Sequence, residues 1–272
     1  MTAAPEKAGP EDMSRVARKF AETRAEGRAA LIGYLTAFDP SRRGSLERIF
    51  AACEAGLDIL ELGVPFSDPT ADGPTIQAAM SRALTGGATL SGTLALAAEV
   101  RARFDLPIVL FSYANPLLTY GPENLVDEAC RVGIDALLVV DLPPEHAAVL
   151  RSPARARGLD WIGLVAPTTT DRRRDAVLAG SSGFVYAVSL TGVTGAPLDP
   201  EDPRLHAGLA SLRGASSLPI AVGFGVRTGS DVRALARHAD GVIVGSALVS
   251  AGERGAGELG GLVAELRAAT GG

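Results

Sequence analysis

A single (β/α)8 barrel, in which eight parallel strands alternate with eight covering helices, is the fold that the amino-acid sequence predicts. Short, almost wholly apolar segments recur along the chain, as is typical of strands buried on both faces. Stretches with the spacing of amphipathic helices separate them, and eight such α/β units match a closed barrel of the TIM type. The expected strands are residues 30–36, 57–63, 107–112, 135–140, 160–166, 183–189, 218–222 and 240–245.

An internal repeat supports this division of the chain. Residues 54–59, 131–136 and 237–242 each contain the end of a helix, a turn, an aspartate and the start of an apolar strand, which is a β/α repeat. An open doubly wound sheet is the alternative. It is disfavoured because no GxGxxG motif follows the first strand, and the glycine-rich turns suited to phosphate come only after the seventh and eighth strands.

Residues 1–28 are expected to be a charged leader that contains one extra helix over residues 13–26 and packs outside the main fold. Residues 29–272 then form the barrel as one catalytic domain. A net charge of −5 gives no sign of nucleic-acid binding, no apolar run is long enough to cross a membrane, and the N-terminus lacks the apolar core of a signal peptide. We therefore expect a cytoplasmic protein whose ligand is a small molecule.

The candidate catalytic residues lie in residues 60–74, where an apolar strand opens into a loop rich in Gly, Pro and Asp. Because side chains alternate along a strand, Glu61 points into the barrel if Leu60 and Leu62 face the helices. A buried, unpaired carboxylate tends to be protonated near neutral pH, which suits a general acid/base. A loop cap or an ion pair is the alternative for Glu61 alone. Asp72 lies in the same loop, far enough along for both carboxylates to surround one ligand.

The sequence offers few residues that suit other types of active-site chemistry. Both lysines, Lys7 and Lys19, fall in the leader, so no barrel strand offers a Schiff-base lysine. The three histidines lack the spacing of metal ligands, and Cys53 and Cys130 form no CxxC pair. The sequence therefore predicts acid/base chemistry by carboxylates, with no metal and no cofactor in this chain.

Small residues at the ends of the late strands predict phosphate binding. Gly225 follows the seventh strand, and Gly245 and Ser246 follow the eighth, at the start of a helix. Backbone N–H groups at such turns bind phosphate, and the turns after strands seven and eight are the usual phosphate site of a barrel. For either glycine turn alone, a tight connection is an equally good explanation. Residues 190–197 have the small side chains of a mobile lid, from which Thr194 and Gly195 could add donors.

Several further residues have less specific interpretations. Tyr113 and Asn115, just after the third strand, could contact a ligand or a partner protein. Asp141 could do the same or cap the helix that follows it. Trp161 is expected to pack in the core, and residues 172–174, all arginine, to form local ion pairs at a solvated helix start.

Several motifs match one known family. The segment LELGVPFSDPTADGPTIQ (60–77) is highly specific, and shorter matches are YLTAFDP (34–40), SYANP (112–116), DLPPEH (141–146), VSLTGVTGA (188–196) and the GFGV and GSAL turns. On these motifs the chain, from about residue 29 to 269, resembles the alpha subunit of tryptophan synthase. The resemblance implies a lyase of tryptophan biosynthesis that cleaves indole-3-glycerol phosphate to indole and D-glyceraldehyde 3-phosphate. It also implies a partner, a beta subunit that carries pyridoxal phosphate (PLP), in an allosteric α2β2 heterotetramer.

By position in these motifs, Glu61 resembles the family's general acid/base, and Asp72 resembles the carboxylate that interacts with the indole N–H. Tyr186 resembles the family's tyrosine beside the substrate. The residues that resemble its phosphate donors are Gly195, Gly225, Gly245 and Ser246.

The chain departs from the family at two positions. Phe38 replaces the usual glycine after the first strand, which places a bulky ring near the expected barrel mouth or subunit interface. Leu190 stands where some members have arginine, so lid closure here does not rely on that charge. Two other functions stay open: a free-standing lyase that releases indole, and a catalytically silent barrel that binds a phosphorylated ligand and activates a partner. Intact Glu61 and Asp72 argue against the silent barrel.

Overall fold

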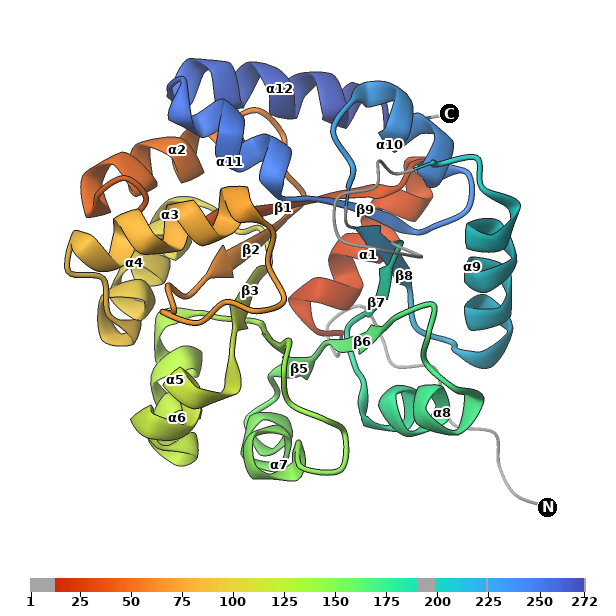
Figure 1. The fold of residues 1–272 in the computed structure, drawn as a ribbon, viewed down its shortest axis with the longest axis horizontal. Helices are drawn as coiled ribbons and strands as arrows, with labels where there is room; N and C mark the ends of the chain where they lie inside the picture. Colours follow the sequence, from red (N-terminus) through yellow and green to blue (C-terminus); the bar gives the residue numbers. More distant parts are fainter. Residues whose placement is uncertain (1–12, 190–198, 224, 272) are drawn as a thin grey trace.

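The computed structural model describes residues 13–189, 199–223 and 225–271. Its strands form one parallel sheet in the order β5-β4-β3-β2-β1-β9-β8-β7-β6, which Figure 1 shows curved into a barrel with helices around it. The strands of the described residues are β1 (Ala30–Thr36), β2 (Ile59–Gly63), β3 (Ile108–Ser112), β4 (Ala136–Val139), β5 (Asp160–Trp161), β6 (Gly163–Val165), β7 (Val185–Val188), β8 (Ile220–Gly223) and β9 (Gly241–Val244).

The two strands at the ends of this sheet are consecutive pieces of one predicted strand. β5 pairs with β4 and β6 pairs with β7, and only Ile162 separates β5 from β6 along the chain. The Ile162 N–H donates to the carbonyl oxygen of Leu137 in β4 at 2.9 Å. The chain itself therefore closes the barrel at its fifth position, and the predicted (β/α)8 fold with an extra N-terminal helix is confirmed.

Helices cover the outside of the barrel between successive strands. All helices of the described residues, including one before the first strand, are α1 (Arg15–Ala25), α2 (Arg42–Glu54), α3 (Pro74–Thr85), α4 (Leu90–Arg103), α5 (Ala114–Tyr120), α6 (Pro122–Val132), α7 (Ala148–Ala156), α8 (Asp171–Gly180), α9 (Pro203–Ala215), α10 (Gly229–Ala236), α11 (Ser246–Glu253) and α12 (Ala256–Ala268). No helix in this part of the chain is long and apolar enough to cross a membrane.

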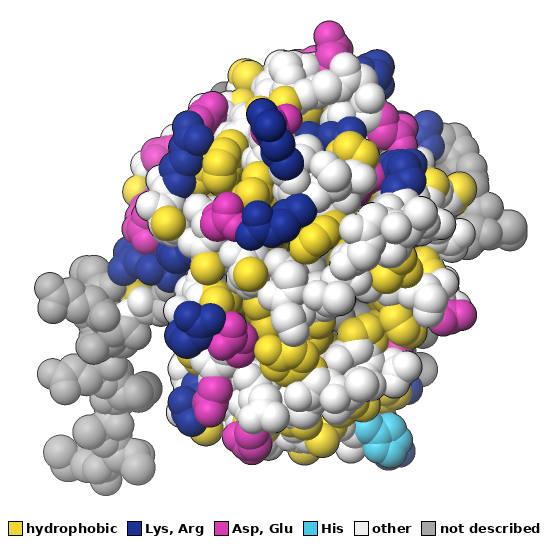
Figure 2. Space-filling model, turned by 90° about the vertical axis from the view of Figure 1, so that its left-hand side faces the viewer, with side chains coloured by type: hydrophobic (Ala, Val, Ile, Leu, Met, Phe, Trp, Pro, Cys, Tyr) yellow, Lys and Arg dark blue, Asp and Glu magenta, His cyan; other side chains and the backbone are white. Residues whose placement is uncertain are grey.

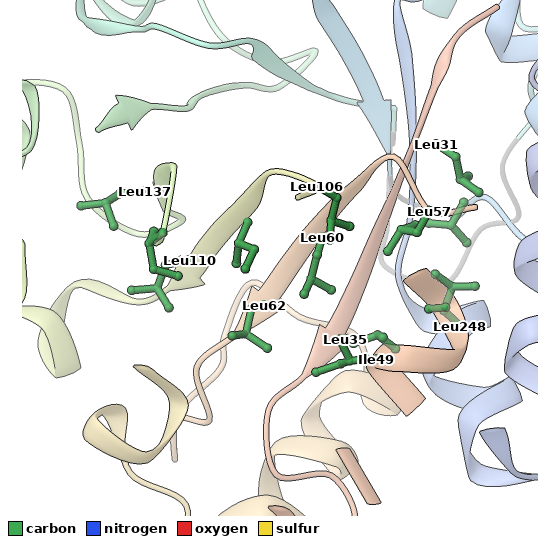
Figure 3. Close-up of a cluster of buried hydrophobic side chains, with 14 of the residues drawn as sticks. Leu31, Leu35, Ile49, Leu57, Leu60, Leu62, Leu106, Leu110, Leu137 and Leu248 are labelled. Carbon is green, nitrogen blue, oxygen red and sulfur yellow. The ribbon is translucent and has the colours of Figure 1, made fainter. Parts of the chain in front are cut away.

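The apolar side chains of the strands form two layers. Leu60 and Leu62 of β2 belong to the layer between the strands and the helices, and Figure 3 shows them on the side where Ile49 of α2 lies. Ile59 belongs to the cluster that fills the barrel interior. Because alternate residues of a strand share a face, Glu61 lies on the interior side with Ile59, as the sequence predicted.

Helix α1 packs across the N-terminal end of the barrel (Figure 1), so this helix of the leader does not pack outside the main fold as expected; residues 1–12 of the leader lie outside the described residues. Ser14 caps the helix by accepting a 3.2 Å hydrogen bond from the Ala17 N–H. Val16 and Phe20 are buried, and the Phe20 ring lies 5.5 Å from that of Phe184, next to β7. Burying each of these side chains contributes about 2 kcal/mol, so the helix is part of the barrel core.

The aspartates of the internal repeat connect neighbouring strands at this same end. Asp58, just before β2, accepts a 2.8 Å hydrogen bond from the Leu31 N–H of β1. Asp135 and Asp240 make the same contact with the first N–H of β3 and of β8, at 2.8 and 2.9 Å. Each carboxylate also pairs with an arginine. The repeat therefore has a structural explanation, because each aspartate fastens the start of its strand to the start of the adjacent one.

The outer face formed by α2, α3 and α4 carries charges of both signs side by side (Figure 2). Ion pairs on these helices join Arg42 to Glu99 and, at 2.8 Å, Arg43 to Glu47. Exposed pairs of this kind contribute little to stability because water and salt screen them. The two apolar layers therefore contribute more to the stability of the fold than these exposed ion pairs do.

Candidate active site

Strand β2 places Glu61 in the barrel interior, opposite Tyr34 of β1 in the strand register. The Glu61 residue is only 1% exposed, and among the described residues its Oε1 atom has no hydrogen-bond partner. Burial, with a smaller contribution from the negative charge of Asp72, raises the pKa of Glu61 to about 8. Glu61 is therefore mostly protonated at neutral pH, as expected for a buried carboxyl group.

Asp72 lies near the end of the loop that follows β2, where several hydrogen bonds hold the chain. Tyr113, just after β3, donates from its hydroxyl to Asp72 Oδ2 at 2.6 Å. The same hydroxyl accepts a 3.0 Å hydrogen bond from the Ala71 N–H, and Gln77 Nε2 donates to the Asp72 carbonyl oxygen at 2.8 Å. Burial raises the pKa of Asp72, and the hydrogen bond from Tyr113 opposes that rise. Of the two acids, Glu61 is thus the more readily protonated.

Two buried tyrosines complete the surroundings of these carboxyl groups. Tyr186 of β7 lies close enough to Glu61 and Asp72 for both charges to raise its pKa, after the larger effect of burial. Gly223 of β8 leaves room for this ring, since a Cβ atom there would lie 2.5 Å from the Tyr186 hydroxyl. Tyr34 is buried as well, and burial followed by the charge of Asp72 raises its pKa. The structure thus brings the predicted Tyr186 together with both predicted acids.

The predicted phosphate-binding residues within the described chain lie at the C-terminal ends of β8 and β9. Gly225 has a φ of 82°, a conformation that favours glycine. Gly245 precedes α11, whose first residue is Ser246, and no side chain caps this helix. The N–H groups of its first turn and its dipole can therefore attract an anion. Thr194 and Gly195 lie outside the described residues.

Phe38, which follows β1 at the C-terminal end of the barrel, is only 8% exposed, and its ring packs against Gly92 of α4, where a Cβ atom would approach it to 2.7 Å. One expectation at this end of the barrel is corrected. Asp141 does not cap the helix that follows it, because its Oδ1 atom accepts a 2.7 Å hydrogen bond from the Ala114 N–H at the start of α5. Leu190, the other departure from the family, lies outside the described residues.

The less specific expectations have mixed outcomes. Trp161 is buried, and Arg174 pairs with Asp171 and Asp175, as predicted. Asn115 is exposed on α5. Within the described ranges, no group of three or more His, Cys, Asp or Glu side chains is arranged to hold a metal ion.

Sequence reasoning did not single out Tyr34 as a site residue, although it lies in the YLTAFDP motif. One sequence feature could have indicated Tyr34: it lies on the interior face of the first strand, two residues before Thr36. It also did not foresee the bond from Tyr113 to Asp72, since the two residues are 41 positions apart. The place of Tyr34 in the site and the hydrogen bond from Tyr113 to Asp72 both depend on how neighbouring strands are aligned.

A closed barrel of parallel strands with helices around it, and with Glu61 buried in its interior, places the chain in the class of (β/α)8 barrel proteins. The family model of the tryptophan synthase alpha chain matches residues 20–270. A tryptophan synthase alpha chain from Gluconacetobacter diazotrophicus is 50% identical over 239 residues, covering 88% of this chain and 87% of that relative. The chain therefore belongs to the tryptophan synthase alpha chain family, and it is a lyase that cleaves indole-3-glycerol phosphate.

Solved structures give the same result. A tryptophan synthase structure from Mycobacterium tuberculosis aligns with a TM-score of 0.89 and 40% identity, covering 96% of this chain and 99% of that one. The alpha subunit of tryptophan synthase from Legionella pneumophila aligns with a TM-score of 0.88 and 33% identity, covering 95% and 98%. A protein from Aquifex aeolicus aligns with a TM-score of 0.88 and 36% identity, covering 95% and 99%.

Proposed function

We propose that Glu61 is the general acid and base of the lyase reaction and that Asp72 stabilises the positive charge formed on the indole ring. The products are indole and D-glyceraldehyde 3-phosphate, as a step of tryptophan biosynthesis. One observation carries this assignment: Glu61 is a buried acid with a pKa of about 8, next to a second acid that ionises more readily. A protonated and an ionised carboxyl group are the two states that the reaction requires at its start.

The first step solves the problem of a poor leaving group. The indole ring leaves badly as a carbanion, so its C3 atom must first be protonated. Glu61, in its protonated form, delivers this proton to C3 and becomes a carboxylate. The ring is then an indolenine whose nitrogen carries positive charge, and the Asp72 carboxylate stabilises that charge by accepting the N–H hydrogen bond. The hydrogen bond from Tyr113 supports this role, because it favours the ionised form of Asp72.

The second step breaks the carbon–carbon bond. The Glu61 carboxylate removes the proton of the hydroxyl on the carbon attached to C3, and that carbon becomes the aldehyde of glyceraldehyde 3-phosphate. The bonding electron pair returns to the ring and neutralises the indolenine, which leaves as indole. Glu61 ends protonated and Asp72 ends ionised, so the site is ready for another substrate without a net change of protons.

The phosphate of the substrate is proposed to bind at the ends of the late strands. Ser246 and the residues after it begin α11, an uncapped helix whose N–H groups suit an anion. Tyr186 would lie beside the reacting part of the substrate, because it is close to both acids. The proposed phosphate donors are Thr194, Gly195, Gly225, Gly245 and Ser246.

The chain is proposed to work in an α2β2 complex with a tryptophan synthase beta subunit in the cytoplasm, with PLP only in the beta subunit and no cofactor in this chain. Support comes from the tryptophan synthases among its relatives of known structure. A free-standing lyase is the alternative, because both acids are intact.

The direct test is indole formation from indole-3-glycerol phosphate, measured with the purified chain alone and with a beta subunit from the same source. A low rate that rises sharply with the beta subunit supports the complex. A high rate without the beta subunit contradicts dependence on the partner and supports the free-standing lyase. Absence of indole in both assays contradicts the proposed catalytic assignment.

A further inference from the structure

Tyr34 is a buried phenol inside the site to which the proposed mechanism gives no role. It is 2% exposed and packs edge-on against the Phe111 ring, with the ring centroids 5.0 Å apart. Glycine at position 63 makes room for it, since a Cβ atom there would lie 2.2 Å from the Tyr34 hydroxyl oxygen. The hydroxyl therefore lies over the C-terminal end of β2, two residues beyond Glu61 in sequence.

The hydroxyl of Tyr34 has a proton to donate. Thr36 Oγ1 donates to the Tyr34 oxygen at 3.2 Å, so this contact uses the oxygen as an acceptor and leaves its own proton free. Among the described residues, the Thr36 hydroxyl is the one hydrogen-bond partner of the Tyr34 hydroxyl, and it acts as the donor. Burial and the charge of Asp72 raise the pKa of Tyr34 well above its usual range, so the group stays protonated at any working pH. A buried donor without an acceptor is costly, which favours an acceptor on a bound ligand.

The position of β1 in the barrel indicates which part of the substrate lies there. β1 pairs with β2 on one side and with β9 on the other. The breaking bond must lie at Glu61 of β2, and the proposed phosphate turn follows β9 at Gly245, where a Cβ atom would lie 3.5 Å from Tyr34 Cβ. A substrate that reaches from Glu61 to Gly245 therefore passes Tyr34. The part of indole-3-glycerol phosphate between the breaking bond and the phosphate is the carbon that carries the second hydroxyl.

We propose that Tyr34 is a substrate-specificity residue, whose hydroxyl donates a hydrogen bond to the second hydroxyl of the glycerol phosphate chain of the substrate. This inference rests on the proposed function, because it uses the positions assigned there to the breaking bond and the phosphate. Tyr34 takes no part in proton transfer to the ring or from the reacting hydroxyl. The hydrogen bond from Tyr34 selects substrates that carry a hydroxyl on the second carbon of the glycerol phosphate group. It also holds this group in place between the breaking bond and the phosphate.

The test compares two substrates in two proteins. Wild-type chain and Tyr34→Phe are assayed with saturating beta subunit, on indole-3-glycerol phosphate and on the analogue in which hydrogen replaces the second hydroxyl. Phenylalanine keeps the ring against Phe111 and Gly63 and removes only the hydroxyl. We expect kcat/KM for the natural substrate to fall about tenfold in the variant, and kcat/KM for the analogue to change less than about twofold.

Comparing the substrates on one preparation makes the result independent of how much protein is folded. Equal losses on both substrates, or no loss on either, would overturn the assignment of Tyr34. Tyr120→Phe, at the end of α5, is the matched control and should change neither value. The Glu61→Gln variant is assayed in the same series. If it retains turnover, the proposed catalytic mechanism is wrong. If it is inactive and Tyr34→Phe affects both substrates alike, only the proposed role of Tyr34 is rejected.

Discussion

The hydroxyl of Tyr113 joins β3 to Asp72 through a 2.6 Å hydrogen bond, while it accepts a hydrogen bond from the neighbouring Ala71 N–H. One side chain, at the junction of β3 and α5, thus fixes the position of an acid that lies on a loop and favours its ionised form. Loop residues are the mobile part of a barrel active site, and an anchor of this kind preorganises them before the substrate binds.

Replacing Tyr113 with phenylalanine removes this anchor and should lower kcat/KM about tenfold. The hydrogen bond favours ionised Asp72, so its loss lets the pKa of Asp72 rise further. Since the proposed mechanism needs ionised Asp72, activity should then disappear at a higher pH as the solution is acidified. The pH dependence of kcat/KM measures this, and an acidic limb at the same pH as in the wild type would contradict it.

Glu61 sets the basic limb of the same profile. In the proposed mechanism Glu61 of the free enzyme holds the proton that goes to indole C3, and the pKa of Glu61 is about 8. We therefore expect kcat/KM to fall as the pH rises through about 8, because the protonated fraction disappears. Constant kcat/KM up to about pH 10 would show that another group donates the proton.

The buried acid should also weaken the fold at high pH. The pKa of Glu61 is higher in the folded chain, about 8, than the usual 4.5, so the folded state binds more protons. Stability from this group is complete below about pH 4.5 and is lost as the pH rises through about 8. Glu61→Gln removes the titration, so its Tm relative to the wild type should increase by ~7 °C between pH 5 and pH 9. A difference in Tm that is independent of pH would contradict the assigned pKa.

Asp58 offers a test of the repeat at the opposite end of the barrel. Asp58→Ala leaves the buried Leu31 N–H without its acceptor and Arg28 without its bidentate partner. The free energy of unfolding should fall by about 3 kcal/mol. The matched control is Asp105→Ala, an exposed partner of Arg15, which should change it by less than about 0.5 kcal/mol. Urea denaturation of both variants measures the two values, and similar values would contradict the structural account of the repeat.

The barrel and the inward direction of Glu61 could be predicted because both depend on local periodicity. Apolar strands, helical spacing and alternation along β2 are properties of short segments, and they place Leu60 and Leu62 against the helices wherever the strand lies. The family resemblance added Tyr186, whose role no local pattern specifies.

Contacts between distant elements were not predictable in the same way. Asp141 binds the start of α5 rather than its own helix because the turns after β3 and β4 meet at one end of the barrel. Phe38 is buried because Gly92 leaves space for its ring on α4. Helix α1 joins the core because the N-terminal end of a closed barrel leaves apolar groups such as Phe184 to be covered. Each outcome depends on tertiary packing that no single segment encodes.

Glu61 is proposed to supply and remove the protons of the reaction, and the Glu61→Gln variant tests this role. The amide has the shape of the protonated acid but can neither give its proton to indole C3 nor accept one from the substrate hydroxyl. Indole formation is measured with saturating beta subunit, together with the Kd for indole-3-glycerol phosphate. We expect turnover to fall at least about a thousandfold while the Kd changes less than about threefold. Turnover within about tenfold of the wild type would contradict it.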